Sequence, residues 1–275
     1  MNAIEIKNLT KHYRGFSLEN LNLTLPSGCI MGLVGENGAG KSTTIRLILG
    51  MSRPDSGEVT IFGQKLTPAL KVQIGVVLDE PGYPGFMNAQ QIGSMLSGIF
   101  RGWEQQTYDK YLTSLHIPSD KPFKDFSKGM KMKLCLAAAL SHGAKLLILD
   151  EATSGLDPVM RDELLDVFND FTRDEGNSVL ISSHIVSDLE KLCDYIAFLH
   201  RGRLMLCREK DELLNEFAFV QGSREEIDAL PTIGRRDGRF GTEAIVRRTD
   251  IPAGMKTGTI TIEDLFIFMA KEEIR

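Results

Sequence analysis

The sequence predicts an α/β fold, and three observations lead to this fold class. Short apolar runs typical of β-strands alternate with helical patterns over about the first 205 residues, which is the pattern of a sheet covered by helices. Residues 82–141 show long helical patterns and no clear strand. After about residue 207 the pattern changes to short helices and strands interrupted by glycine. We therefore expect a core over residues 1–207, a helical subdomain inserted at about 82–141, and a small α+β domain over 208–275.

The core is expected to contain a mixed β-sheet with an antiparallel β edge. Two segments near the N-terminus are typical of edge strands. The apolar run at 30–34 is bounded by glycines and indicates a buried strand. The expected strands are 4–6, 16–25, 30–34, 59–62, 74–78, 146–149, 179–182 and 195–199.

The expected helices show apolar residues at helical spacing. In the core and the inserted subdomain they are 41–49, 89–100, 130–140 and 160–171. In the C-terminal domain they are 209–216, 224–230 and 263–271, with strands around 234–248. The Met and Phe residues of 265–269 indicate a small core rather than a binding stripe.

Residues 35–43 fit the phosphate-binding pattern G-x-x-x-x-G-K-[ST] between an apolar strand and a helix, which is the context that the motif requires. Its glycines let successive backbone N–H groups point at phosphate oxygens, and the helix adds its positive N-terminal end. We expect Lys41 to neutralise the β- and γ-phosphates and Ser42 to ligate Mg²⁺. The motif predicts a P-loop NTPase core that binds ATP. Its residues are Gly35, Glu36, Asn37, Gly38, Ala39, Gly40, Lys41, Ser42 and Thr43.

Two acids, Asp150 and Glu151, end the apolar strand at 146–149. Ligands of open α/β sheets bind beyond the carboxyl ends of such strands. We expect Asp150 to reach the metal through its waters and Glu151 to polarise an attacking water as general base. His184 follows the strand at 179–182 in the same way, which favours contact with the γ-phosphate over a structural or solvated role.

Ser127 precedes the helical pattern at 130–140 and is expected to cap it. A capped helix N-terminus beside Gly129 also has the chemistry of an anion site. The chain therefore contains two segments, 35–43 and 127–131, that suit an anion.

Taken in order, these motifs resemble those of the nucleotide-binding subunit of an ABC transporter, and the resemblance covers about residues 1–205. The set comprises the P-loop, Ser127 to Met130, Asp150 with Glu151, Ser154 to Asp157, and His184. The resemblance implies that two subunits face each other head to tail around ATP. Ser127 and Gly129 of one subunit would then close over the γ-phosphate held by Lys41 of the other.

The resemblance gives roles to two further residues. Tyr13 matches the aromatic residue on which adenine stacks, and a tyrosine packed at a sheet edge is the alternative. Asp157 would lie at the subunit interface and relay closure between the two sites. A simple turn ended by Pro158 is the alternative for that segment.

The chain departs from the family pattern after the strand at 74–78. The family usually has a glutamine there that ligates Mg²⁺ and links the nucleotide to the membrane partner. Asp79 takes this position here, and Glu80 is the other candidate. A carboxylate can also ligate the metal, because it is a hard oxygen donor.

A second departure lies beside Ser127. Lys128 stands where the family commonly has glycine, and Met130 and Lys131 stand where many members have two glutamines. Ser127 and Gly129, the residues expected to face phosphate, are kept. This form is similar to bacterial export-type subunits, including those of bacitracin and lantibiotic exporters.

The composition limits the kinds of partner and the cellular location that we expect. The net charge of −5 argues against nucleic acid. The four cysteines lack C-x-x-C spacing and are expected to be buried or idle thiols in a reducing compartment. Glu5 lies where a signal peptide needs an apolar core, and no apolar run approaches the ~18 residues of a membrane span. We expect a cytoplasmic chain, peripheral on the inner face of the cell membrane through its partner.

The leading hypothesis is an ATPase that pairs with a second nucleotide-binding subunit, a copy or a paralogue, and drives a separate transmembrane permease. A second hypothesis is an ABC protein that acts on ribosomes or DNA. Such proteins generally carry two nucleotide domains or a long coiled-coil insertion, and the sequence contains neither. A third is a regulatory module that binds ATP without hydrolysing it. The sequence specifies no transported substrate.

Overall fold

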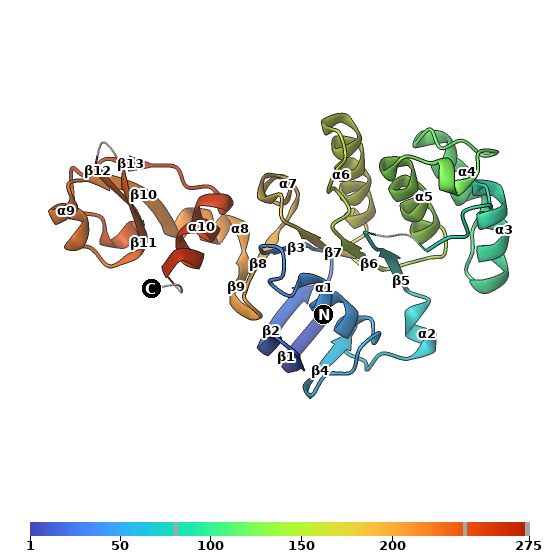
Figure 1. Cartoon of the computed structure of the whole chain (residues 1–275), viewed down its shortest axis with the longest axis horizontal. Helices are drawn as coiled ribbons and strands as arrows, with labels where there is room; N and C mark the ends of the chain where they lie inside the picture. The colour runs from blue at the N-terminus through green and yellow to red at the C-terminus, as the bar shows by residue number, and fades with distance from the viewer. Residues whose placement is uncertain (80–81, 239–240, 273–275) are drawn as a thin grey trace.

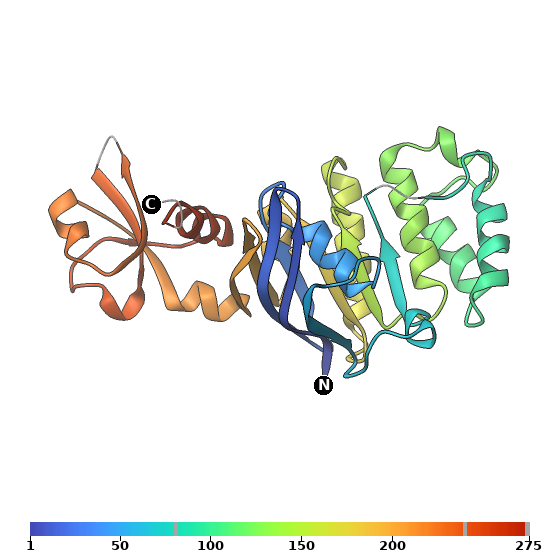
Figure 2. The ribbon, with the colours of Figure 1, turned by 60° about the horizontal axis from the view of Figure 1, so that its bottom comes forward.

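The computed structural model describes residues 1–79, 82–238 and 241–272. The molecule has three parts along its long axis (Figure 1). A central core lies between a helical lobe, residues 82–141, and a C-terminal unit, residues 210–272. The turned view shows the two outer parts on opposite sides of the core (Figure 2).

A six-stranded sheet forms the centre of the core. Its strands are β3 (Ile30–Val34), β5 (Ile74–Val77), β6 (Leu146–Asp150), β7 (Ser178–Ser183), β8 (Tyr195–His200) and β9 (Arg203–Glu209). Their spatial order is β5-β6-β7-β3-β8-β9, with β9 antiparallel to β8 and the other neighbours parallel. Strands β3, β6 and β7 are buried along their whole length, as expected where both faces of a parallel sheet are covered. The predicted mixed sheet is confirmed.

Alternate residues of β3 face two different cores, because side chains alternate between the faces of a strand. Ile30 and Val34 join one apolar cluster, and Met31 and Leu33 join the cluster on the other face. The helices of the first cluster include α5 (Lys128–Leu140), α6 (Pro158–Thr172) and α7 (Val186–Leu192), and those of the second include α1 (Lys41–Ile48). In Figure 1, α6 and α7 lie above the sheet and α1 below it.

The second face of the sheet is also covered by a separate antiparallel sheet. Its strands are β1 (Asn2–Tyr13), β2 (Phe16–Pro26) and β4 (Ser56–Ile61), in the order β2-β1-β4. The predicted antiparallel edge is therefore present as a sheet of its own. The strand expected at 4–6 extends to Tyr13, because β1 pairs with a neighbour on each side and this pairing supports its polar residues. A short helix, α2 (Pro68–Lys71), leads from β4 to β5.

The helical lobe contains α3 (Ala89–Ile99), α4 (Gln105–Ser114) and α5 around an apolar cluster of its own. Asn88 and Gln91 form a capping box at the start of α3. Helix α4 was not expected, because its sequence is mostly polar and it buries only Tyr108 and Leu112. Within the described part of 82–141 there is no strand, apart from one isolated bridge between Asn88 and Pro122.

The C-terminal unit follows β9, which ends two residues beyond the expected boundary at 207. Its elements are α8 (Lys210–Glu216), β10 (Phe217–Gly222), α9 (Arg224–Asp228), β11 (Thr232–Gly238), β12 (Gly241–Arg247), β13 (Thr257–Gly258) and α10 (Ile262–Glu272). The four strands form one sheet in the order β11-β12-β10-β13. Helix α10 returns to the core, where the Phe266 and Phe198 rings lie 5.3 Å apart and the Ile262 N–H donates to Glu190 Oε2 at 3.1 Å. The residues of 265–269 thus join the core rather than a binding stripe.

Strands β9 and β10 were not expected from the sequence. Residues 204–209 of β9 are half-buried without alternation, so the strand lacks a period of two. Among the described residues, no helix combines the length and the apolar character needed to cross a bilayer.

Candidate nucleotide site

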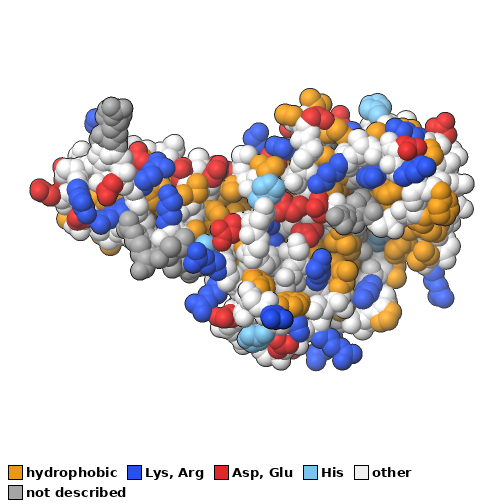
Figure 3. Space-filling model, in the orientation of Figure 1, with side chains coloured by type: hydrophobic (Ala, Val, Ile, Leu, Met, Phe, Trp, Pro, Cys, Tyr) orange, Lys and Arg blue, Asp and Glu red, His pale blue; other side chains and the backbone are white. Residues whose placement is uncertain are grey.

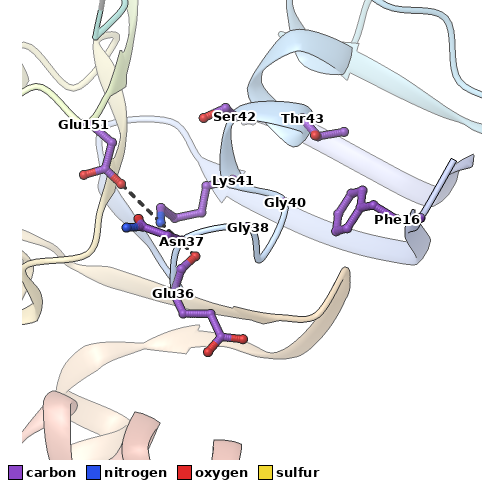
Figure 4. A pocket seen from close by; sticks show the side chains of 10 residues that line it. Phe16, Glu36, Asn37, Gly38, Gly40, Lys41, Ser42, Thr43 and Glu151 are labelled. Atoms are coloured by element: carbon purple, nitrogen blue, oxygen red, sulfur yellow. Dashed lines mark hydrogen bonds and ion pairs between the residues drawn. The ribbon is translucent and has the colours of Figure 1, made fainter. Parts of the chain in front are cut away.

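The loop between β3 and α1 opens onto a cavity of about 490 Å³. Position 40 must be glycine, because its φ is +112° and a Cβ atom there would lie 2.9 Å from the ring of Phe16. Gly38 also has positive φ and has no heavy atom within 4 Å of its Cβ position, so its backbone is open to a ligand. The cavity, drawn in Figure 4, is lined by Gly15, Phe16, Glu36, Asn37, Gly38, Gly40, Lys41, Ser42, Thr43 and Glu151.

The turn between β8 and β9 supports the loop from behind. The Gly202 N–H donates to the Ala39 carbonyl at 2.9 Å. Gly35 lies so close to this turn that a Cβ atom would stand 2.5 Å from the Leu199 carbonyl oxygen. A larger residue at position 35 would therefore displace the loop from this turn. Gly35 and Ala39 therefore support the loop, although they do not line the cavity.

Lys41 projects into this cavity from the first turn of α1. Its side chain is 5% exposed, and Nζ donates to the Gly35 carbonyl at 2.7 Å. Nζ also lies 3.2 Å from Glu151 Oε1, an ion pair marked by a dashed line in Figure 4. A phosphate that binds Lys41 must compete with this carboxylate.

Glu151 stands between Lys41 and His184. Its Oε2 lies 2.7 Å from His184 Nδ1, and its own N–H donates to Ser182 Oγ at 3.1 Å. Glu151 has φ +54°, a left-handed conformation that is uncommon for residues other than glycine and that occurs often at functional sites. The bend turns the chain after β6, and the side chain points into the cavity. Three residues singled out from the sequence are thus brought together from three separate segments.

Asp150 is the last residue of β6 and is 9% exposed. Its Oδ1 accepts a hydrogen bond from Ser182 Oγ at 2.6 Å, which holds the carboxylate at the strand end. Ser42 and Asp150 offer the hard oxygen atoms that Mg²⁺ prefers, and Mg²⁺ commonly takes only one or two protein ligands beside water and substrate phosphates. No group of three His, Cys, Asp or Glu residues gathers in the described parts of the chain. The donor set therefore suits Mg²⁺ bound together with a phosphate substrate.

Ser127, Gly129 and Asp157 do not line the cavity. Ser127 caps α5 by accepting from the Met130 N–H at 3.2 Å, as the sequence predicted, and Asp157 caps α6 by accepting from the Met160 N–H at 3.0 Å. Gly129 packs beneath Met160, where a Cβ atom would stand 2.3 Å from Cε. The three residues are positioned at the starts of two helices beside each other.

Tyr13 lines a neighbouring pocket of about 660 Å³ rather than the phosphate cavity itself. Its side chain is 45% exposed at the end of β1, and its hydroxyl lies 3.1 Å from Ser52 Oγ. The two pockets share Gly15, Phe16 and Gly38. Phe16 was missed from the sequence, although an aromatic residue directly after the Gly15 turn was a signal.

His200 was also missed. It is 2% exposed at the end of β8, and its Nδ1 lies 3.1 Å from Glu36 Oε1 in the phosphate loop. Neither ring nitrogen has a well-aligned hydrogen bond within the described part of the chain. The contact joins the phosphate loop to the same turn that supports Ala39. A histidine that lies far from the loop in sequence gives no signal for this.

Asp79 lies outside the phosphate cavity. Its Oδ1 is 2.7 Å from Lys128 Nζ, so the residue in the usual glutamine position pairs with the unusual lysine beside Ser127. Glu80, the other candidate for that position, lies outside the described residues. Figure 3 shows acidic side chains gathered near the middle of this face, where the core meets the helical lobe.

None of the four cysteines is part of a disulfide. Burial raises the pKa of the Cys135 thiol to about 12 and also raises the pKa of Cys193, Cys29 and Cys207. No cysteine lines the phosphate cavity. The sequence expectation of buried or idle thiols agrees with this placement.

Comparison with known proteins gives a consistent result. The family model described as ABC transporter matches residues 18–154. The chain is 33% identical to an uncharacterised ABC transporter ATP-binding protein, YhcH, of Bacillus subtilis, over 99% of this chain and 98% of that protein. It is 35% identical to the bacitracin transport ATP-binding protein BcrA of Enterococcus faecalis, over 74% of this chain and 68% of that protein.

A third relative is the lantibiotic transport ATP-binding protein SrtF of Streptococcus pyogenes, 35% identical over 76% of this chain and 91% of that protein. Among solved structures, an ATP-binding subunit of an ABC transporter superposes with a TM-score of 0.69 and 28% identity, over 77% of this chain and 91% of that one. The P-loop fold and the export-type resemblance are confirmed. The chain belongs to the ABC transporter family, as one of its ATP-binding ATPase subunits.

Proposed function

We propose that this subunit binds MgATP in the cavity of Figure 4 and, paired with a second subunit, hydrolyses it to drive an export-type membrane permease. One observation carries the proposal: the Glu151 carboxylate is held between the Lys41 ammonium at 3.2 Å and the His184 ring at 2.7 Å. Lys41 and Glu151 thus line the phosphate cavity together, and the His184 imidazole contacts the far oxygen of the same carboxylate. The export direction follows the bacitracin and lantibiotic relatives.

The phosphate loop binds the triphosphate through its backbone N–H groups and through Lys41. The amides of the turn at Gly38 and Gly40 and the N-terminus of α1 present partial positive charge to the phosphate oxygens. Lys41 leaves Glu151 and neutralises the β- and γ-phosphates. Tyr13, exposed beside the cavity, stacks on adenine. The buried stem of Lys41 keeps its ammonium in place, so little conformational freedom is lost on binding.

Hydrolysis then follows from the groups around Glu151. A water attacks the γ-phosphorus, its proton passes to the Glu151 carboxylate, and the bond from the γ-phosphorus to the bridging oxygen breaks, leaving ADP and phosphate. His184 Nδ1–H donates to Glu151 Oε2 and holds the base while its ring faces the γ-phosphate. Ser42, and Asp150 through water, would hold a bound Mg²⁺, which would supply charge neutralisation to the phosphates.

The second subunit completes the site. Ser127, Gly129 and Asp157 stand at the starts of α5 and α6, outside the cavity of their own chain. In a two-fold arrangement they would meet the γ-phosphate held by the partner, which places ATP at the interface. The partner is a copy of this chain or a paralogue. The pair sits on the inner face of the membrane against the permease, and nucleic acid has no part in this cycle.

The test is Glu151→Gln, measured by steady-state phosphate release and by equilibrium binding of a fluorescent ATP analogue. We expect turnover to fall by about 10²–10⁴-fold, the usual contribution of a general base, because the amide cannot accept the proton. Binding should persist or tighten, since the carboxylate that competes for Lys41 is gone. Unchanged turnover would overturn the assignment of Glu151, and no phosphate release from the parent chain with its permease would indicate a regulatory module.

A further inference from the structure

An exposed ion pair joins the segment after β5 to the start of α5. Lys128 Nζ lies 2.7 Å from Asp79 Oδ1, and the two side chains are 46% and 48% exposed. Asp79 belongs to the core and Lys128 to the helical lobe, 49 residues further along the chain. Among the described residues this is the one ion pair between these two segments. Neither residue lines the phosphate cavity, so nucleotide binding does not explain the pair.

Lys128 also contacts a third segment. A Cβ atom at Gly155 would lie 3.7 Å from Lys128 Cδ and 3.9 Å from Nζ, so the lysine side chain passes over the loop 154–157. Gly155 has φ +72°, a conformation that glycine adopts without strain. The Lys128 side chain therefore pairs with Asp79 after β5 and lies beside the loop before α6, while its backbone forms part of the 127–129 turn.

The contacts along α5 differ between its middle and the 127–129 turn at its start. Further along α5, Ala139 packs against Gly75 of β5, and Lys133 pairs with Glu163 of α6 at 2.6 Å. At the first turn of α5, Gly129 packs on the flexible Met160 side chain. Asp79 adds a directional, charge-assisted bond at the exposed side of this turn.

We infer that Asp79 is a positioning residue that holds Lys128, and through it the 127–129 turn, in the orientation needed to meet a second subunit. The inference rests on the proposed two-subunit function and adds a positioning residue to it. When the bond is lost, the lysine and the turn gain freedom that must be given up again on association. Loss of Lys128 instead leaves the Asp79 charge unpaired on a face that meets a triphosphate.

The experiment is a double-mutant cycle with Asp79→Asn and Lys128→Met, made in a Glu151→Gln parent so that ATP is not consumed. The dissociation constant of the ATP-dependent dimer is measured by sedimentation, and ATP affinity is measured separately at low protein concentration. We expect each single variant to raise the dissociation constant of the dimer about 10-fold. Loss of one exposed ion pair should contribute about 3-fold, and a symmetric dimer contains two such pairs. The double variant should be no weaker than the singles, because both remove one interaction.

ATP affinity of the monomer should stay unchanged throughout, which a general loss of structure would not allow. The coupling energy between Asp79 and Lys128 should also decrease at 1 M salt, because salt screens an exposed ion pair. The control is Glu243→Gln, which removes an ion pair with Arg236 in the C-terminal unit. The Arg236 and Glu243 side chains are 52% and 23% exposed, and this variant should leave the dimer unaffected.

Three outcomes would overturn the inference in different ways. If the parent dimerises with ATP but the two substitutions have no effect, or have effects that multiply, Asp79 does not act through Lys128. If the Glu151→Gln parent never dimerises with ATP, the two-subunit proposal itself fails and the inference falls with it. If Asp79→Asn weakens Mg²⁺-dependent ATP binding, Asp79 acts as a metal ligand, and its positioning role is rejected.

Discussion

The phosphate loop and the 127–129 turn are both glycine-containing segments at the start of a helix, yet they are built differently. The loop is enclosed by buried contacts: Lys41 is 5% exposed, and Ala39 is bonded to the turn after β8. The 127–129 turn is held by the Ser127 cap, by packing of Gly129 against Met160 and Leu156, and by one exposed ion pair. The difference teaches that the chain pre-organises its phosphate loop by buried contacts, while the turn that we propose to meet a second subunit depends in part on an exposed ion pair.

The largest expected effect on ATP binding is at Lys41, on the rigid side of this comparison. Lys41→Ala should weaken ATP binding about 100-fold, because charge-assisted hydrogen bonds contribute about 1.5–3 kcal/mol. Equilibrium binding of a fluorescent ATP analogue measures this. Lys133→Met is the matched control, since Lys133 is also buried and paired with a glutamate, Glu163. Equal losses in the two variants would show that Lys41 acts through stability alone.

The next effect is at His184, which lies 2.7 Å from the Glu151 carboxylate. His184→Ala should lower phosphate release about 10²-fold while ATP affinity changes little, because the base loses its orientation. His184→Asn, which keeps a donor near Oε2, should recover part of the rate. A loss of affinity as large as the loss of rate would contradict this division of roles.

A smaller effect is expected at the 127–129 turn. Gly129→Ala places a methyl group against Met160 Cε, the mobile end of a side chain, so folding should tolerate it and thermal unfolding should change little. Dimerisation driven by ATP should weaken about 10-fold, because the first turn of α5 shifts by a fraction of an ångström. Gly98→Ala in α3, with no atom within 4 Å of its Cβ position, is the control. Equal dimer constants would place Gly129 outside the interface.

The smallest effect concerns the end of β1 that carries Tyr13. Asp55 accepts from Lys11 Nζ at 2.8 Å and from the His12 N–H at 2.7 Å, and the Lys11 bond is the main cause that lowers the Asp55 pKa to about 2. A lowered carboxyl pKa adds stability above the unfolded pKa of about 4, and this stability is lost as pH falls towards 2. The unfolding midpoint of Asp55→Asn should therefore lie slightly below that of the parent at pH 6, and the two should converge near pH 2. A constant difference at both pH values would exclude the carboxylate as the cause.

The sequence was sufficient where the local pattern is strong. The turn from β3 into α1 needs glycines, a lysine and a hydroxyl residue within nine positions, so its pattern could be read directly. Strands β3, β6 and β7 are apolar on both faces and stood out for that reason. Helix α4 and strands β9 and β10 carry weak patterns, because their stability comes from neighbours rather than from their own periodicity.

Contacts between distant segments were decided by the tertiary structure. The sequence by itself determined the fold class, the phosphate loop and the acids at the end of β6, since these depend on residues a few positions apart. Only the folded chain brought His184 to Glu151, His200 to Glu36, and Lys128 to Asp79. Those distances depend on strand order and on how the helical lobe packs, and neither is encoded in the spacing of residues along one segment.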